Sequence, residues 1–225
     1  MGSNERRERE RLETRKKILD AARALFVQHG FDAVTMRKIA EKIEYTPTAI
    51  YFHFKDKETL VRELCVADFL DFGQKFAKAA SEPDVVERMK KSGHAYAEFA
   101  AKYPNSYRLM FMSPARPADG MGDVAWKGNP AEDAYAFLKL TVTEAMEKGL
   151  VREELTDPEL VAQIVWSGMH GVVSLHIAMS CDQWTAWRPL KERVKTMIDV
   201  LIRGLFRATP DAGPPAKAPA KKRKG

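Results

Sequence analysis

The sequence predicts an all-α protein of about nine helices, and three features point to this fold class. Apolar residues recur at three- and four-residue spacing along most of the chain, which is the period of a helix with one buried face. A capping residue, often followed by proline, precedes several of these stretches, as at the start of many helices. No stretch sustains the two-residue alternation of a half-buried strand.

The first three predicted helices are closely spaced. An apolar stripe over 18–26 predicts a helix that Gly30 ends. Thr35 is suited to cap the second helix, because its hydroxyl can accept a hydrogen bond from a free backbone N–H and apolar positions then recur over 36–43. A Thr-Pro pair at 46–47 starts a short third helix that ends near 52–54.

Six further helices follow. Asp56 is suited to cap a long one that runs to about residue 78, before the Glu82-Pro83 break. The others are predicted over 84–102, 105–112, 130–148, 159–179 and 190–205, the last two after prolines. Residues 113–129 hold three glycines and two prolines and are predicted to form a loop.

Charge divides the chain into a nearly neutral body and two basic ends. Residues 1–17 carry seven basic and four acidic residues, a net +3, and 208–225 carry five basic and one acidic, a net +4. The total of +6 leaves −1 for the body, which argues against a blanket basic surface for RNA or chromatin. We expect a charged arm over 1–14, a first helical domain over 15–61, a second domain over 62–207 and a disordered basic tail over 208–225.

Several classes of protein are not favoured. Cys65 and Cys181 lie far apart, so neither a disulfide framework nor a cysteine zinc site is expected. The charged start lacks the apolar core of a signal peptide, and polar residues interrupt the apolar stretch 161–179, so we expect a cytoplasmic protein outside the membrane. Nucleotide-binding, hydrolase and metalloprotease motifs are missing, which predicts no enzyme, cofactor or metal.

Residues 35–54 have the spacing of a helix-turn-helix, with the turn at 42–45. In that motif the second helix enters the major groove of DNA. The candidate contact residues offer hydroxyls, a methyl group, rings and basic groups, which suit phosphates and thymine methyls. They are Thr35, Arg37, Thr46, Pro47, Thr48, Ala49, Tyr51, His53 and Lys57.

This region resembles the DNA-binding domain of the TetR family of bacterial repressors. The resemblance covers about residues 15–61 and rests on the pattern AxxLFxxxGFxxxTxxxIA from Ala22 and on YxHFxxKExL from Tyr51. It implies a dimer of all-α subunits, each with a three-helix reading head and a C-terminal domain for an effector and for dimerisation. It also implies phosphate contacts at the positions of Thr35, Tyr51, His53 and Lys57. The turn departs from the family pattern at Glu44, where a positive φ would be mildly strained.

The second domain resembles the WHG-type C-terminal domain of some TetR-like regulators. The resemblance covers roughly 90–205 and rests on the segments 103–111 and 166–175, with Trp166, His170 and Gly171 giving the name. Gly168 and Gly171 lie on one predicted helix face, where a close approach of another helix or a ligand would explain them. An apolar effector pocket is predicted from aromatic and methionine side chains, although these could equally be core. The candidates are Phe99, Tyr107, Phe111, Met112, Trp126, Trp166, Met169 and His170.

These features predict a dimeric repressor that binds a palindromic operator and is released by a small, largely apolar effector. The wide apolar stripes of 158–179 and 189–205 suit a four-helix bundle between two subunits, or burial within one subunit. Two alternatives stay open. One is a small-molecule-binding protein or enzyme with a vestigial helix-turn-helix. The other is a DNA-binding protein whose second domain only dimerises.

Overall fold

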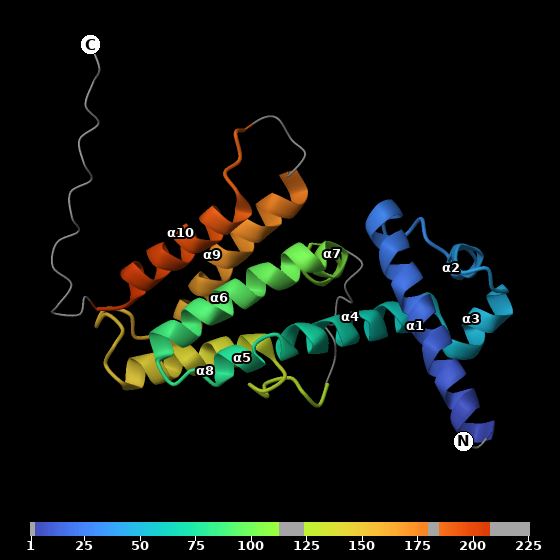
Figure 1. The fold of residues 1–225 in the computed structure, drawn as a ribbon, viewed down its shortest axis with the longest axis horizontal. Coiled ribbons are helices and arrows are strands. Elements are labelled where there is room, and N and C mark those ends of the chain that lie inside the picture. Colours follow the sequence, from blue (N-terminus) through green and yellow to red (C-terminus); the bar gives the residue numbers. More distant parts are fainter. Residues whose placement is uncertain (1–2, 113–123, 180–184, 208–225) are drawn as a thin grey trace, which may run out of the picture.

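The fold consists of a small lobe and a larger lobe joined by one long helix. The computed structural model describes residues 3–112, 124–179 and 185–207. In Figure 1, α1 to α3 form the small lobe, and α4 runs from it into the larger lobe. The helices in the described part are α1 Ser3–His29, α2 Met36–Lys42, α3 Pro47–His53, α4 Lys57–Gln74, α5 Ala77–Ala80, α6 Val85–Lys102, α7 Pro104–Phe111, α8 Ala134–Glu147, α9 Pro158–Met179 and α10 Leu190–Leu205.

The all-α prediction is confirmed, and the predicted helices all form. Three boundaries differ by four or more residues from those expected, and one of them is the start of α8, which lies at Ala134 and not at residue 130. Helix α1 begins at Ser3, and ion pairs one turn apart, such as Arg6–Glu10, stabilise this charged extension. Helix α4 ends at Gln74, and the single turn α5 follows it. The expected tail at 208–225 and most of the expected loop at 113–129 lie outside the described residues.

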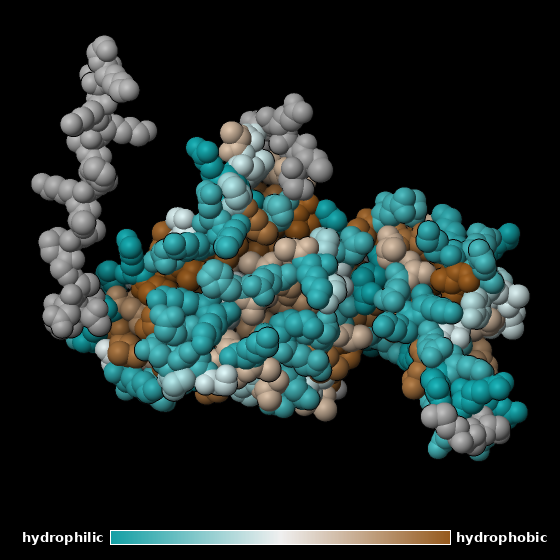
Figure 2. Space-filling view, in the orientation of Figure 1, coloured by the Kyte–Doolittle hydropathy of each residue, from teal (hydrophilic) through white to brown (hydrophobic). Residues whose placement is uncertain are grey.

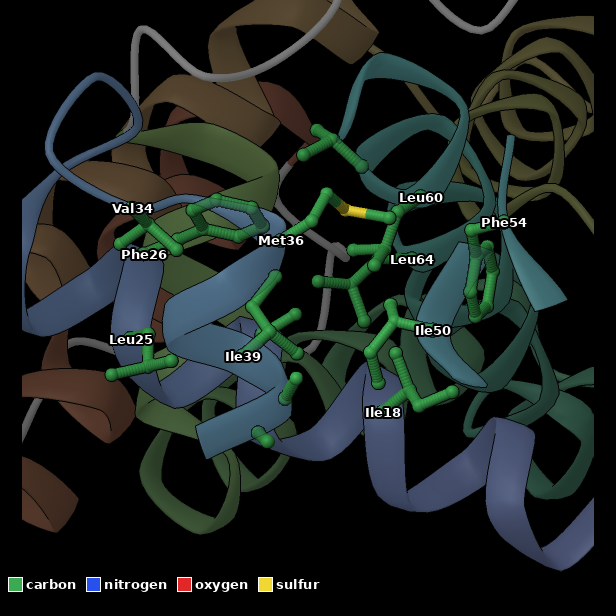
Figure 3. Packing of buried hydrophobic residues seen from close by; sticks show 14 of the residues in the cluster. Ile18, Leu25, Phe26, Val34, Met36, Ile39, Ile50, Phe54, Leu60 and Leu64 are labelled. Atoms are coloured by element: carbon green, nitrogen blue, oxygen red, sulfur yellow. The ribbon is translucent and has the colours of Figure 1, made fainter. Parts of the chain in front are cut away.

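The small lobe, α1 to α3, is the predicted reading head. One apolar cluster and the capped starts of α2, α3 and α4 stabilise it. Figure 3 shows Ile18, Phe26, Ile39, Ile50, Phe54 and Leu64 packed together from four helices. The caps expected at Thr35, Thr46 and Asp56 form, because each side chain accepts a hydrogen bond from the backbone N–H three residues on. Each cap is worth about 1 kcal/mol. Short helices such as α2 and α3 therefore keep fixed ends.

Besides α4, which connects the lobes along the chain, helix α7 packs against both lobes. Its Leu109 is fully buried in the cluster of the reading head, whereas Tyr107 and Met110, on the same helix, are buried in the cluster of the larger lobe. Next to it, Arg23 of α1 forms an ion pair with Asp68 of α4, at 2.5 Å between Nη2 and Oδ1. The reading head therefore packs against the second domain through both apolar and charged contacts.

The larger lobe is built around α9. This helix packs on α10, α8 and α6, and α10 also packs on α6. By length and composition α9 meets the criterion for a membrane span, the one helix of the described residues to do so. Its residues Val165, Met169 and Val173 are buried against neighbouring helices, whereas Leu160, Ile164 and Leu175 are exposed.

Candidate nucleic-acid interface and ligand cavity

The turn between α2 and α3 has the tight geometry that the motif requires. Glu44 has a φ of 60°, as expected for a position that glycine would favour. The backbone N–H groups of Ile43 and Tyr45 both donate to the carbonyl of Ala40, at 3.2 and 2.9 Å, which brings the chain sharply out of α2. The strain at Glu44 is therefore balanced by hydrogen bonds that close the turn.

Helix α3 is anchored on one side and open on the other. Ile50 is fully buried and Phe54 is buried directly after the helix, so both belong to the core. Thr46, Pro47 and Thr48 are exposed, and Ala49 is half-buried. Two aromatic residues stand out from this open side: Tyr51 is 54% exposed and Phe52 is 79% exposed. An open aromatic helix face of this kind can reach into a groove of DNA.

Phe52 is a candidate contact that the sequence reasoning missed. Its ring lies edge-on to His53, with 5.5 Å between the ring centroids, and is otherwise open to solvent. In the sequence it reads as one more apolar residue beside Phe54. The signal that could have found it is its position two residues before Phe54, on the opposite side of a helix whose buried side is set by Ile50.

Three other predicted DNA contacts are already engaged within the subunit. Thr35 accepts from the N–H of Lys38, and the exposed Arg37 pairs with Glu41 at 2.9 Å. The ammonium of Lys57 donates to the carbonyls of Phe31 and Val34, at 3.0 and 3.2 Å, and lies over the Phe31 ring. Lys57 therefore fixes the connection between α1 and α2.

His53 is half-buried, and its Nδ1 is buried without a hydrogen-bond partner among the described residues. Burial lowers the pKa of His53, and the nearby charges of Arg11 and Arg15 lower it further. A neutral imidazole can donate a hydrogen bond to a phosphate but brings no full positive charge to it.

The larger lobe holds a partly open apolar cavity of about 120 Å³ between α4, α6, α7, α8, α9 and α10. Four of the eight residues predicted for it line it: Phe111, Trp126, Trp166 and Met169. The described residues that the sequence reasoning missed are Phe69, Phe72, Phe76, Met89, Ser92, Gly93, Tyr96, Asp133, Ala134, Tyr135, Leu138, Val165, Ile198, Leu201 and Ile202.

The other four predicted pocket residues lie outside the lining. Phe99 is buried in the core beside Phe72, and Met112 is exposed at the end of α7. Tyr107 and His170 are packed against each other behind the cavity wall, with their rings stacked at 5.7 Å. Met112 and His170 each follow a lining residue, Phe111 and Met169, by one position, and side chains one position apart on a helix point about 100° apart.

A chain of hydrogen bonds backs the cavity wall. Trp166 Nε1 donates to Tyr96 Oη at 3.1 Å, the two hydroxyls of Tyr96 and Tyr107 lie 2.7 Å apart, and Tyr107 Oη lies 2.6 Å from His170 Nδ1. Burial lowers the pKa of His170 and raises the pKa of Tyr96 to about 12. A neutral His170 can accept from Tyr107, so every group in the chain is satisfied without charge.

We expect acid to weaken the fold through His170. Because its pKa is lowered in the folded protein, the unfolded state binds more protons below the ordinary pKa of histidine. The stability that His170 contributes is therefore complete above about pH 6.5 and is lost as the pH falls below that value. Urea unfolding at pH 7.5 and 5.5 should show a smaller loss for His170→Asn than for the natural protein. The same change at the exposed His94 is the control, and an equal effect of both variants would contradict the assignment.

The described residues hold no group of three or more His, Cys, Asp or Glu side chains that could bind a metal ion. Cys65 is buried in the cluster of the reading head, away from the cavity. The polar groups at the cavity include a hydroxyl–indole chain and the cap of α8. This arrangement can bind a small molecule.

The outer faces of α9 and α10 are apolar and uncovered in the single chain. Leu160, Ile164 and Leu175 of α9 and Val200 of α10 are exposed. Figure 2 shows hydrophobic residues along these two helices, whereas the projecting start of α1 is hydrophilic. Gly168 allows α10 to approach α9, because an added Cβ would lie 3.3 Å from Leu201 and Met197, while Gly171 has no neighbour within 4 Å. Exposed apolar patches of this kind mark contact surfaces.

An exposed helix-turn-helix and a separate helical domain with an apolar cavity define a DNA-binding transcriptional regulator. Comparison with protein families agrees with this class. Residues 18–64 match the bacterial regulatory proteins of the tetR family, and residues 89–201 match the tetracyclin repressor-like C-terminal domain. The chain belongs to the TetR family.

Individual relatives of this chain are described as transcriptional repressors or regulators. The chain is 29% identical over 103 residues to the probable acrEF/envCD operon repressor of Escherichia coli K12, covering 45% of this chain and 47% of that protein. It is 34% identical over 76 residues to the repressor AcnR of Corynebacterium diphtheriae, covering 34% and 38% of the two chains. It therefore aligns with less than half the length of these two relatives. An HTH-type regulator of Bacillus subtilis, YhgD, is 25% identical over 86% of this chain and 97% of its own.

Solved structures share the whole fold. The fatty acid degradation regulator FadR of Bacillus halodurans has a TM-score of 0.69 at 21% identity, covering 84% of this chain and 94% of its own. A SmeT–triclosan complex has a TM-score of 0.65 at 22% identity, covering 87% and 92%. At these identities the likeness establishes the fold.

Proposed function

We propose that this protein is a dimeric, cytoplasmic transcriptional repressor that binds a palindromic operator and is released by a small apolar effector. The observation that carries the proposal is the pairing of an open recognition helix with an aromatic cavity in one chain, joined by α4 and α7. The names of the E. coli and Corynebacterium relatives support repression, and the SmeT–triclosan complex supports a ligand in this fold. The cavity favours this function over a second domain that only dimerises.

The proposed DNA contacts come from the open side of the reading head. Thr46, Pro47, Thr48 and Ala49 would approach base edges at the start of α3. Thr35, Arg37, Tyr51, His53 and Lys57 would contact phosphates, with Arg37 and Lys57 first giving up part of their present contacts to Glu41 and to the α1–α2 connection. Phosphate contacts position the head, whereas contacts to base edges give sequence specificity.

The exposed apolar faces of α9 and α10 support the proposed dimer. Two copies that met through these faces would bury them in a four-helix bundle and relate the two reading heads by a two-fold axis. The two recognition helices would then reach half-sites about one helical turn of DNA apart, or a small multiple of it. This geometry requires an inverted-repeat operator.

The effector would act by changing the distance between the two heads. Helix α4 begins beside the reading head at Lys57 and contributes Phe69 and Phe72 to the cavity. Phe76, two residues after the end of α4, also lines the cavity. A ligand that fits the cavity better in one position of α4 and α7 shifts the population toward it. The repressor is released only if, in that position, the distance between the two reading heads no longer matches the spacing of the operator half-sites.

Selection of the purified protein on random duplex DNA tests the proposal. The expected result is an enriched inverted repeat whose affinity falls with salt in proportion to the number of phosphates contacted. Binding of the enriched duplex should then weaken when a cavity ligand is added. Weak binding with no enriched sequence would contradict the function and would favour a ligand-binding protein whose helix-turn-helix is vestigial.

Two adjacent substitutions on α3 should have different effects on DNA binding. Tyr51→Phe removes one hydroxyl proposed to contact a phosphate, so its affinity should fall about three- to ten-fold on the selected duplex and on unrelated duplexes alike, the equivalent of about 1 kcal/mol. Phe52→Ala should lower affinity for the selected duplex only, because an apolar ring contacts thymine methyls. Replacing thymine by deoxyuridine in the selected duplex should reproduce the Phe52→Ala loss. Equal losses on all duplexes for both variants would contradict these roles.

A further inference from the structure

Eight of the 19 described residues that line the cavity in the larger lobe are aromatic. Phe69 is stacked with Trp126 at 6.4 Å between centroids and meets Phe111 edge-on at 5.4 Å. Trp166 contacts Phe111 at 5.9 Å and Tyr135 at 5.7 Å. Rings in these offset and edge-on arrangements hold a defined shape, and the space between them suits another flat apolar ring.

The cavity has room for a single ring. A volume of about 120 Å³ is close to the ~150 Å³ of an engineered apolar cavity that binds benzene. The space therefore accommodates one ring with a small substituent before any helix moves.

The described lining of the cavity contains one acidic residue and no basic residue. Among the described lining residues Asp133 alone carries a charge at neutral pH, and none is Lys, Arg or His. The Asp133 carboxylate is occupied, because it accepts hydrogen bonds from the backbone N–H groups of Gly128, Tyr135 and Ala136 at 2.9 to 3.2 Å. A buried anionic ligand would meet no cation here, and burying an unpaired charge is costly.

One hydrogen-bond donor of the lining is unused. Trp166 donates to Tyr96 Oη, whose own hydroxyl lies 2.7 Å from that of Tyr107, Tyr135 donates to Glu159, and the Ser92 hydroxyl donates to the carbonyl of Arg88. Trp126 is 91% buried, with 9% of its surface exposed, and its Nε1–H has no partner among the described residues. A buried donor without a partner costs free energy that an incoming acceptor would recover.

We propose that the cavity binds an uncharged aromatic molecule of about one ring, whose hydrogen-bond acceptor takes the Nε1–H of Trp126. The proposal deepens the effector role proposed above and rests on it. It assigns Trp126 as the residue that orients the ligand, and it sets this cavity apart from one built for a fatty acid anion, which would need a cationic anchor.

Four probes of nearly equal shape separate the contributions. Acetophenone offers a carbonyl acceptor, cumene (isopropylbenzene) replaces it with methyl groups, benzoate adds a negative charge, and phenyltrimethylammonium adds a positive one. Their dissociation constants would be measured by calorimetry on the full chain and on Trp126→Phe, which keeps a ring but removes the donor. Trp187→Phe is the matched control, because the Nε1 of Trp187 is also buried without a partner among the described residues and Trp187 does not line the cavity.

We expect Trp126→Phe to weaken acetophenone binding about three- to ten-fold and to leave cumene binding within two-fold, which also shows that the cavity is intact. Trp187→Phe should change neither. Benzoate should bind more than about a hundred-fold more weakly than acetophenone.

Three outcomes would overturn the proposal: equal acetophenone affinity in the natural protein and in Trp126→Phe, benzoate binding as tightly as acetophenone, or phenyltrimethylammonium binding more tightly than either. The last would assign the aromatic walls and Asp133 to a cation. Each of these can occur while the protein still binds its selected duplex, so the repressor function would stand. If the repressor function failed and the ligand proposal held, acetophenone would still bind and Trp126→Phe would still weaken it, but no DNA sequence would be bound specifically.

Discussion

Replacing Arg23 by alanine is expected to reduce the free energy of unfolding by about 3 to 5 kcal/mol. Arg23 forms two hydrogen bonds with the carboxylate of Asp68, which is 5% exposed, and Asp68 also bonds with Ser106. Burial raises the pKa of Asp68 even though Arg23 and Ser106 lower it. Without Arg23 the carboxylate would be buried with little to offset its loss of hydration. Urea denaturation at pH 7 measures the effect.

A double substitution separates the ion pair from the packing around it. Arg23→Met with Asp68→Leu removes both charges together, so most of the lost stability should return. Asp20→Ala is the control, because Asp20 also pairs with Arg23 but is exposed, and its removal should cost less than about 1 kcal/mol. A double variant no more stable than Arg23→Ala would show that the two sites contribute through packing and not through their charges.

Gly73→Ala is expected to destabilise the fold by about 3 kcal/mol and to distort the cavity. Gly73 lies in α4, and a Cβ added there would come within 1.8 Å of the backbone oxygen of Glu132. The obstacle is backbone, so the connection that carries Trp126 and leads to Asp133 must move. Unfolding in urea measures the loss, and acetophenone binding reports the distortion.

The neighbouring change Gln74→Ala places the same new residue on the exposed side of the same helix. It should alter the free energy of unfolding by less than about 0.5 kcal/mol. If Gly73→Ala were as mild as Gln74→Ala, or more stable than the natural protein, the contact between α4 and residue 132 would be wrong.

Local signals were sufficient to predict most of the fold. Thr35, Thr46 and Asp56 are each followed by an apolar helical stripe, and their caps form as expected. The exposed extension of α1 was not foreseen, because its stability comes from charged pairs and not from a buried stripe. The end of α4 was placed late, because nothing local at 74–76 marks a helix end.

The site could be predicted only in part. The open face of α3 follows from the motif and from the burial of Ile50. The cavity depends on which sides of several helices meet, and that is a tertiary property. Trp126 and Trp166 were anticipated because they are large and apolar, whereas Phe69 and Tyr96 were missed because their helices carry aromatics on more than one side.

The position of Leu109 has a consequence for recombination among such regulators. A reading head moved to another protein as residues 15–65 would leave behind a side chain that fills its own core, since Leu109 arrives from α7, far along the chain. The graft would contain a hole the size of a leucine, unless the recipient supplies an equivalent residue at the same place. Exchange of DNA specificity between relatives therefore succeeds more readily by replacing the exposed residues of α3 than by cutting the chain between lobes.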